Sequence, residues 1–221
     1  MCALYQSAPQ LKEQGIHLVS CDEKTGMQAI ERMATPMKRG QVERMETNYT
    51  RHGTQCLIAN FEVATGAIVS PTIGDTRKEE DFAAHIKNTV NTSPNAKWIF
   101  IVDQLNTHKS SSLVEYVAHA CGYTESLGEK GKSGILKDME SRAKFLSDEH
   151  HTIQFVYTPK HASWLNQIEI WFSILSRKLL KRLSSCSTDD LKRKVSRFID
   201  YFNLTAAKAF KWTYKGRPLT K

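Results

Sequence analysis

The sequence lacks every feature of a membrane, secreted or fibrous protein. No apolar run approaches the roughly 20 residues that a helix needs to cross a bilayer. The N-terminus has no basic segment followed by an apolar one, so it does not resemble a secretory signal. Internal repeats and low-complexity tracts are also missing. The 221 residues are enough for one substantial core, and we expect a single domain over residues 1–221.

Cysteine is scarce and scattered. The five residues are odd in number and show neither the spacing of a disulfide framework nor a Cys-x-x-Cys zinc motif. They are Cys2, Cys21, Cys56, Cys121 and Cys186. We therefore expect reduced thiols and a cytoplasmic protein.

Positive charge is confined to the last third of the chain. The net charge is +8, yet residues 160–221 hold 14 Lys or Arg against 4 acids, a net of +10. The preceding residues hold 17 basic and 19 acidic groups, a net of −2. Such an excess suits a polyanion, most commonly nucleic acid, although a solvated basic face has the same composition.

The hydrophobic pattern predicts a mixed α/β sheet. Short apolar runs predict five strands, over residues 17–21, 54–61, 67–72, 97–103 and 152–157. A hairpin turn at 62–66 is expected to join the second strand to the third. Apolar residues at helical spacing predict helices over 79–90, 110–121, 135–146 and 164–182, and a last one that begins at Ser187. Three early strands followed by α/β alternation indicate a mixed five-stranded sheet with helices on its faces.

Two segments of this pattern stand apart. Residues 122–150 are polar and glycine-rich and are expected to be an insertion, while residues 187–221 form a basic, helical C-terminal part. Three tryptophans, Trp164, Trp171 and Trp212, are assigned to core packing in preference to base stacking.

Three acids lie where this sheet would bring them together. Asp22 is expected to end the first strand and Asp103 the fourth, and Glu169 lies at the edge of the buried stripe of the 164–182 helix. If the first and fourth strands are neighbours, both aspartates emerge at one edge of the sheet. A helix packed across that edge then adds Glu169.

Three converging carboxylates repel one another, and a divalent cation resolves that repulsion. Hard oxygen ligands suit Mg²⁺ or Mn²⁺, and two such ions can catalyse attack on a phosphodiester. Acids at strand ends are also common on ordinary surfaces, where most are solvated or paired with Lys or Arg.

Four segments add to this pattern. CDEKTGMQAIER at 21–32, VDQLNTHKS at 102–110, YTPKHASWLNQIEIWFSIL at 157–175 and FIDYFNLTAAKAFKWTYKGRPL at 198–219 closely resemble bacterial insertion-sequence transposases of the mariner superfamily. The resemblance spans essentially the whole chain. It implies an RNase H-like fold with helices on both faces of the sheet, and a DDE triad whose members fall on Asp22, Asp103 and Glu169, with two Mg²⁺ or Mn²⁺ ions per site.

Other motif positions receive supporting roles from the same resemblance. Asn106 and His108 are expected to bind a phosphate or orient a nucleophile, with a structural turn as the alternative. Lys160 and His161 are expected to contact DNA. The remaining candidates for DNA binding or site support are Asn166, Arg177, Lys178 and Lys181.

The sequence departs from this family in two places. Family members usually have a shorter gap between the second and third acids, which supports an insertion at 122–150. They also begin with helix-turn-helix modules that bind the element's terminal repeats, and no such region precedes Asp22 here. A separately encoded helix-turn-helix half is therefore an expected partner.

The primary hypothesis is a transposase that cleaves transposon ends and joins them to target DNA. Its expected partners are double-stranded DNA and at least one further copy of the chain, at the bacterial nucleoid and without membrane contact. The alternatives are a non-catalytic, truncated or domesticated DNA-binding module, and a general RNase H-like nuclease.

Overall fold

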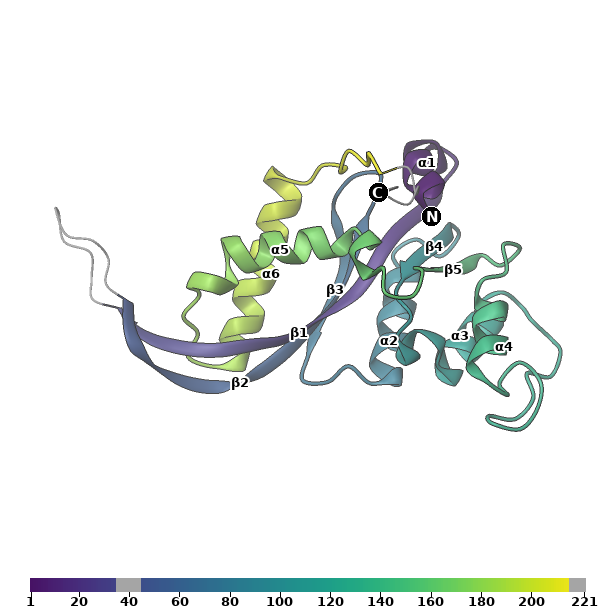
Figure 1. Cartoon of the computed structure of the whole chain (residues 1–221), viewed down its shortest axis with the longest axis horizontal. Coiled ribbons are helices and arrows are strands. Elements are labelled where there is room, and N and C mark those ends of the chain that lie inside the picture. Colours follow the sequence, from purple (N-terminus) through teal and green to yellow (C-terminus); the bar gives the residue numbers. More distant parts are fainter. Residues whose placement is uncertain (35–44, 215–221) are drawn as a thin grey trace, which may run out of the picture.

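A five-stranded mixed sheet organises the molecule (Figure 1). The computed structural model describes residues 1–34 and 45–214. The sheet order is β3-β2-β1-β4-β5; β1, β2 and β3 are antiparallel, while β1, β4 and β5 are parallel. The strands are β1 (Ile16–Ala34), β2 (Met45–Glu62), β3 (Ile68–Gly74), β4 (Lys97–Val102) and β5 (Ile153–Tyr157). The mixed five-stranded sheet predicted from the sequence is confirmed.

Helices cover both faces of this sheet, as predicted. The α-helices are α1 (Cys2–Glu13), α2 (Glu79–Val90), α3 (Ser111–Ala120), α4 (Met139–Leu146), α5 (Ile168–Lys178) and α6 (Thr188–Thr205). Three short 3₁₀ turns are η1 (Asn106–Lys109), η2 (Ser163–Leu165) and η3 (Leu180–Arg182). None of the helices in the described ranges is long and apolar enough to span a bilayer.

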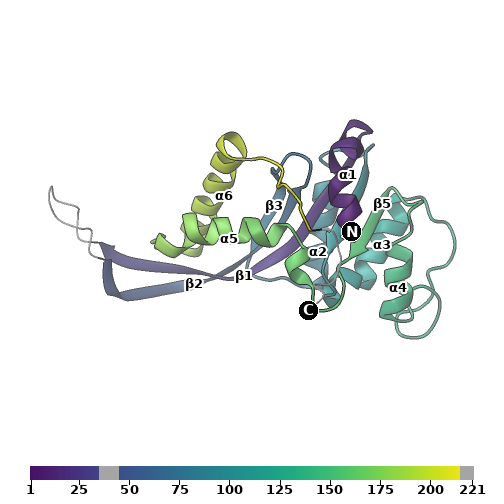
Figure 2. The ribbon, with the colours of Figure 1, turned by 45° about the horizontal axis from the view of Figure 1, so that its top comes forward.

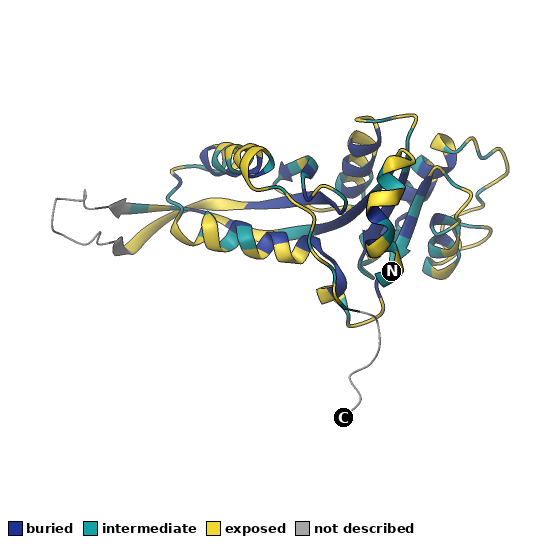
Figure 3. Ribbon diagram, turned by 90° about the horizontal axis from the view of Figure 1, so that it is seen from above, coloured by how far each residue is buried: buried dark blue, intermediate teal, exposed yellow. Residues whose placement is uncertain are grey.

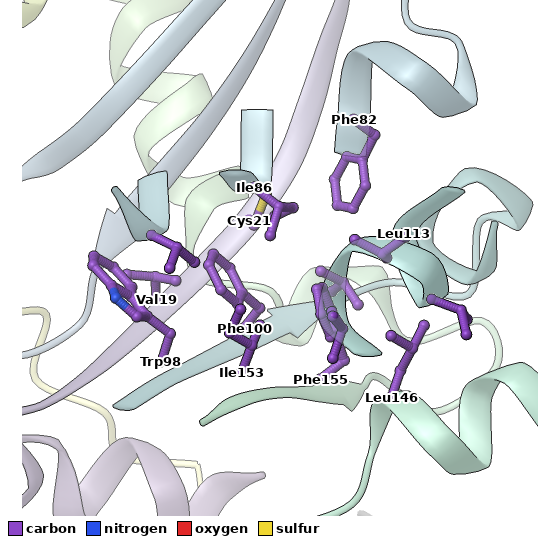
Figure 4. Close-up of a cluster of buried hydrophobic side chains, with 14 of the residues drawn as sticks. Val19, Cys21, Phe82, Ile86, Trp98, Phe100, Leu113, Leu146, Ile153 and Phe155 are labelled. Carbon is purple, nitrogen blue, oxygen red and sulfur yellow. The ribbon is translucent and has the colours of Figure 1, made fainter. Parts of the chain in front are cut away.

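The largest core lies under α2, α3 and α4 (Figure 4). Trp98, Phe100 and Phe155 of the parallel strands stack on one another, with ring centroids 5.8 and 5.3 Å apart. All three are fully buried, and Phe82 and Leu113 close the core from the helices. The continuous apolar run of β4 is therefore explained by burial on both of its faces. Leu136 and Leu146, from the region expected to be an insertion, contribute to this core.

The opposite face carries two separate cores. Helices α5 and α6 pack on β1, β2 and β3, with Trp171 and Phe172 as the largest buried contributions of α5. Helix α1 packs on β1 and β4 through Tyr5 and Ala8. Trp212 lies against Tyr5, with ring centroids 4.7 Å apart, and the Tyr5 hydroxyl donates to the carbonyl of Leu165 at 2.8 Å. Both ends of the described chain therefore support the turn that precedes α5.

Strands β1 and β2 are much longer than predicted. The sequence suggested that the first strand ends at Asp22, but it continues to Ala34 and pairs with β2 as far as Met45. The pair forms an arm that extends beyond the rest of the sheet (Figure 2). Its sequence is mixed polar because only one face is covered, where Met27 and Ala29 pack under α5 and α6. In contrast, β4 and the part of β1 that pairs with it are mostly buried (Figure 3).

The helix predicted over 164–182 is interrupted. Residues 163–165 form η2, α5 begins only at Ile168, and Leu179 separates α5 from η3. Trp164 was assigned to the core, and this was wrong: it is 57% exposed and lies against Tyr214. The helical register fails there because Asn166 has an extended backbone conformation. The core assignments of Trp171 and Trp212 are confirmed.

Helix ends follow local capping chemistry. The predicted start at Ser187 is confirmed, because the Ser187 hydroxyl accepts a hydrogen bond from the amide of Asp190 at 3.0 Å. Helix α4 begins at Met139 instead of Ile135, because Asp138 caps it by accepting from the amide of Ser141 at 2.8 Å. Helix α1 was not predicted from the sequence.

A neutral histidine is buried between α2 and the sheet. His85 is fully buried. Its Nε2 atom lies 2.8 Å from the side-chain nitrogen of Asn60, and its Nδ1 atom lies 2.8 Å from the hydroxyl of Thr72. Burial lowers the pKa of His85 to about 3. The folded protein therefore holds the ring uncharged at pH values where an unfolded chain would protonate it.

Stability should fall as the pH drops below about 6.5, because the unfolded state then binds a proton that folded His85 does not. This single group should cost about 2 kcal/mol between pH 7 and pH 5. We expect His85→Gln to lose that part of the pH dependence, measured by urea denaturation at the two pH values. His119→Gln, at an exposed position on α3, should retain it. Equal pH dependence in the two variants would contradict this account.

Candidate functional site

Two aspartates meet where β4 ends beside β1. The parallel register pairs Ser20 with Ile101, so that two residues further along each chain Asp22 lies beside Asp103. The two acids thus lie together where β4 ends, as the sequence predicted, although β1 continues past Asp22. Their proximity is evident in the pKa of Asp22, to which the charge of Asp103 contributes.

Asp22 is held in a buried setting. Its side chain accepts hydrogen bonds from the amide of Glu23 at 2.8 Å and from the side-chain amide of Asn166 at 3.3 Å, and the residue is only 6% exposed. Burial, reinforced by the charges of Asp103 and Glu23, raises the pKa of Asp22 to about 7. A neighbouring cation would favour the ionised form.

Asp103 is more open and is held by His108. The Nδ1 atom of His108 lies 2.9 Å from Oδ1 of Asp103, which also accepts from the amide of Leu105 at 2.9 Å. Partial burial would raise the pKa of Asp103, but the hydrogen bonds from His108 and Leu105 outweigh it, and the pKa is lowered. The carboxylate therefore stays ionised.

His108 bridges two acids from different strands. Its Nε2 atom lies 3.1 Å from Oε1 of Glu23, and its ring packs against the ring of Phe82, with the centroids 4.3 Å apart. Burial disfavours a charged ring, but the carboxylates of Asp103 and Glu23 outweigh this effect and raise the pKa of His108 to about 9. His108 therefore lies buried between the two acids, within the η1 turn, and its contacts are with their carboxylates.

Glu23 is a site residue that the sequence analysis missed. Side chains alternate along a strand, so Asp22 and Glu23 point to opposite faces of β1. Asp22 faces α5, while the Glu23 carboxylate is buried on the other face and reaches His108. The adjacent acidic pair was visible in the sequence, but the partner of its second member lies 85 positions away.

Asn166 and Ser20 attach α5 to β1. The Asn166 side-chain amide donates to the carbonyl of Cys21 at 2.9 Å, and its oxygen accepts from the Ser20 hydroxyl. The same hydroxyl accepts from the amide of Ile168 at 2.9 Å. We call these two residues the Ser20–Asn166 clamp. Site support was among the roles expected for Asn166, whereas Ser20 had no distinguishing signal in the sequence.

Glu169 lies next to this clamp but outside the acidic pair. Its amide donates to the carbonyl of Asn166 at 3.1 Å, which places its backbone close to Asp22. Its side chain is exposed in the first turn of α5. Within residues 1–34 and 45–214, no three His, Cys, Asp or Glu side chains gather closely enough to hold a metal ion. The structure thus brings Asp22 and Asp103 together and leaves the Glu169 carboxylate apart.

Cations flank the open side of Asp103. Lys109, which the sequence analysis did not single out, lies 4.8 Å over the ring of Tyr157 and donates to Gln104 at 2.5 Å. Burial, followed by the charge of Lys160, lowers the pKa of Lys109. Lys160 and His161 are exposed in the loop after β5, and Asn106 is exposed at the start of η1. A second group of exposed cations lies along α5 and η3, at Arg177, Lys178 and Lys181.

The clamp yields a stability prediction. Ser20→Ala leaves the Asn166 oxygen and the Ile168 amide without a buried partner, which should lower the free energy of unfolding by about 1–3 kcal/mol. Ser173→Ala, at an exposed position on α5, should change it by less than about 0.5 kcal/mol. Urea denaturation measures both variants. A Ser20→Ala protein as stable as Ser173→Ala would show that the clamp contributes nothing.

The sequence matches a described family over most of its length. The model of the family described as DDE superfamily endonuclease matches residues 17–192. This range contains Asp22, Asp103 and Glu169, and it is well over half of the chain. No curated protein sequence matches the chain significantly.

Solved structures show the same fold. A Mos1 transposase paired-end complex with the left transposon end superposes with a TM-score of 0.53 at 12% identity, covering 96% of this chain and 55% of that one. A pre-cleavage Mos1 transpososome gives a TM-score of 0.54 at 11% identity, covering 90% and 53%. At these identities the likeness shows the RNase H-like fold alone. The chain spans about half the length of either relative.

Proposed function

Because this chain belongs to the family of DDE superfamily endonucleases, we propose that it is a transposase catalytic domain that cleaves DNA phosphodiesters at transposon ends and transfers the freed strand to target DNA. One observation carries the proposal: Asp22 and Asp103 lie side by side just past the last parallel pair of β1 and β4, Ser20 with Ile101. The DNA-bound state of the structural relatives is consistent with this function.

The acidic pair fits divalent cations by its chemistry. Both ligands are hard carboxylate oxygens, and burial, with a contribution from the charge of Asp103, raises the pKa of Asp22, a cost that a bound cation would relieve. Glu169 would be the third ligand. Its carboxylate forms no hydrogen bond or ion pair with any residue described here, so that a change of side-chain rotamer costs no existing contact. Mg²⁺ or Mn²⁺, two per site, would activate a water or 3′-hydroxyl and stabilise the leaving oxygen.

The surrounding residues would prepare the site. His108 holds Asp103 in one orientation, and Glu23 balances the charge of the imidazolium. The Ser20–Asn166 clamp fixes the start of α5 relative to Asp22. Lys109 and Lys160 on the open side of Asp103 would bind a DNA phosphate, together with Asn106 and His161. Pairing of two ends requires at least two copies of the chain, and a separate helix-turn-helix partner would recognise the repeats.

A second candidate, a catalytically idle DNA-binding module, is favoured by one observation. The Glu169 side chain is exposed and does not join the acidic pair. The two functions make opposite predictions about metal binding and cleavage.

Cleavage should depend on the acidic pair. With Mg²⁺ or Mn²⁺ and a duplex carrying the terminal repeat from the DNA beside the gene, Asp103→Ala should lower strand cleavage by at least about 10²-fold, because it removes a group that stabilises the transition state. Asp200→Asn, which neutralises an exposed acid on α6, should cleave as the wild type does. Gel analysis of the labelled duplex measures both. Equal cleavage by Asp103→Ala and wild type would disprove the proposed site.

Metal binding should stabilise the folded protein. Saturating Mn²⁺, at about 100 times its Kd, contributes about 2.7 kcal/mol, equivalent to roughly 5–10 °C in Tm for a chain of this size. We expect differential scanning fluorimetry to show this shift for the wild type and for Asp200→Asn. Asp22→Asn should lose it, and Glu169→Gln should lose a smaller part. An unchanged shift in Asp22→Asn would place the ion elsewhere, and no shift in the wild type would favour the idle module.

A further inference from the structure

A groove leads from Glu169 along α5. One hollow of about 540 Å³ opens beside Glu169 and Ser173. A second hollow of about 380 Å³ continues between β1 and η3, as far as Lys181. Both are lined by Lys24, Ser176 and Arg177, so they form one depression, which we call the α5 groove. Helix α5 lies alongside the β1–β2 arm in both ribbon views (Figures 1 and 2).

The walls of the α5 groove are cationic. Lys24 comes from β1, where it lies two residues after Asp22 and so points to the same face of the strand. Its ammonium lies 6.0 Å from the centre of the Phe172 ring, which directs it towards α5. Arg177 and Lys181 come from the opposite wall. Across the described ranges, none of these three cations forms an ion pair.

Three cations and one acid, Glu169, line the groove, and an excess of positive charge along a groove indicates an anionic chain as its ligand. Between Glu169 and Lys178, α5 advances about 14 Å, at about 1.5 Å per residue, and η3 extends the groove to Lys181. Along the axis of a duplex each strand advances about 3.4 Å per phosphate, so the part of the groove beside α5 matches about four phosphates of such a strand. The groove is lined by no exposed aromatic ring, which favours contacts with the backbone over base stacking.

We propose that the α5 groove binds the sugar–phosphate backbone of one DNA strand where it continues past the acidic site, with Lys24, Arg177 and Lys181 as its phosphate contacts. This inference rests on the proposed function, since it takes the strand to be the substrate of that site. Lys24 then links the two, because Asp22 and Lys24 lie on the same face of β1 and would contact successive parts of the strand. Lys178 lies on the same helix but lines neither hollow.

The salt dependence of DNA binding tests the groove. The affinity of the full chain for a labelled 20-nucleotide single strand, and for the corresponding duplex, is measured by fluorescence anisotropy at several salt concentrations. The triple variant Lys24→Gln, Arg177→Gln, Lys181→Gln should reduce the slope of log K against log salt for the single strand by about 2, because each phosphate contact contributes about 0.7. The control variant Lys87→Gln, Lys137→Gln, Lys144→Gln removes three exposed cations outside the groove, and it should leave the slope nearly unchanged.

A single substitution tests the groove even if the triple variant does not fold. Ser173→Glu adds a negative charge at an exposed position of the groove and should weaken single-strand binding several-fold, whereas Ser173→Ala should not. The inference would be overturned if the groove triple variant kept the wild-type slope, or if the control triple variant lowered the slope equally. Loss of duplex binding alone would overturn it as well.

The outcome is separable from that of the proposed function. Asp103→Ala should bind the single strand like the wild type while failing to cleave. If Asp103→Ala abolishes cleavage but the groove variants bind normally, the enzyme stands and the groove fails. If Asp103→Ala cleaves normally, the proposed function itself fails.

Discussion

The structure depends on holding two like charges side by side at the edge of a sheet. Asp22 and Asp103 are placed there by the parallel pairing of β1 with β4, and their repulsion adds to the cost of burying Asp22. The fold offsets part of this cost from beneath through the imidazolium of His108, whose charged form Glu23 helps to maintain, although the charge of Glu23 itself also disfavours ionised Asp22. The upper side is left open towards Lys109 and Lys160, where an anionic substrate and its cations would enter. A site that is charged but not neutralised internally is suited to ligands that bring positive charge.

Much of the architecture could be predicted because it rests on local patterns. The apolar run that ends at Asp103 and the helical stripe of α2 follow directly from the periodicity of their residues. The mixed character of the sheet follows from the α/β alternation, whereas the strand order is known only from the structure. The long β1–β2 arm and α1 could not be predicted in this way. The arm is stabilised by α5 and α6, which are distant in the sequence, and its own residues have no strong strand pattern beyond Asp22.

Some residues of the candidate site could be predicted from the sequence, and others could not. Asp22, Asp103 and His108 carry motif and strand-end signals, so they could be identified, and the structure places them together. Glu23 and Ser20 have no such signal, because their roles come from partners 85 and 146 positions away. Trp164, by contrast, had a clear signal in the sequence that led to a wrong assignment. An uninterrupted helical pattern placed it in the core, but hydrogen bonds between Asn166 and β1 break the helix before α5 and leave the ring outside.

The hydrogen bond from Tyr5 to Leu165 has a practical implication for anyone who prepares this protein. The region matched by the family model begins at residue 17, so a fragment designed from that match would omit α1. It would retain Asp22, Asp103 and Glu169 and, apart from Ile16, all of the sheet. Yet it would expose Leu18, Ile99 and Ile101 to water and remove the donor that holds the turn before α5. Such a fragment would contain all three motif acids, but its exposed apolar surface would favour aggregation.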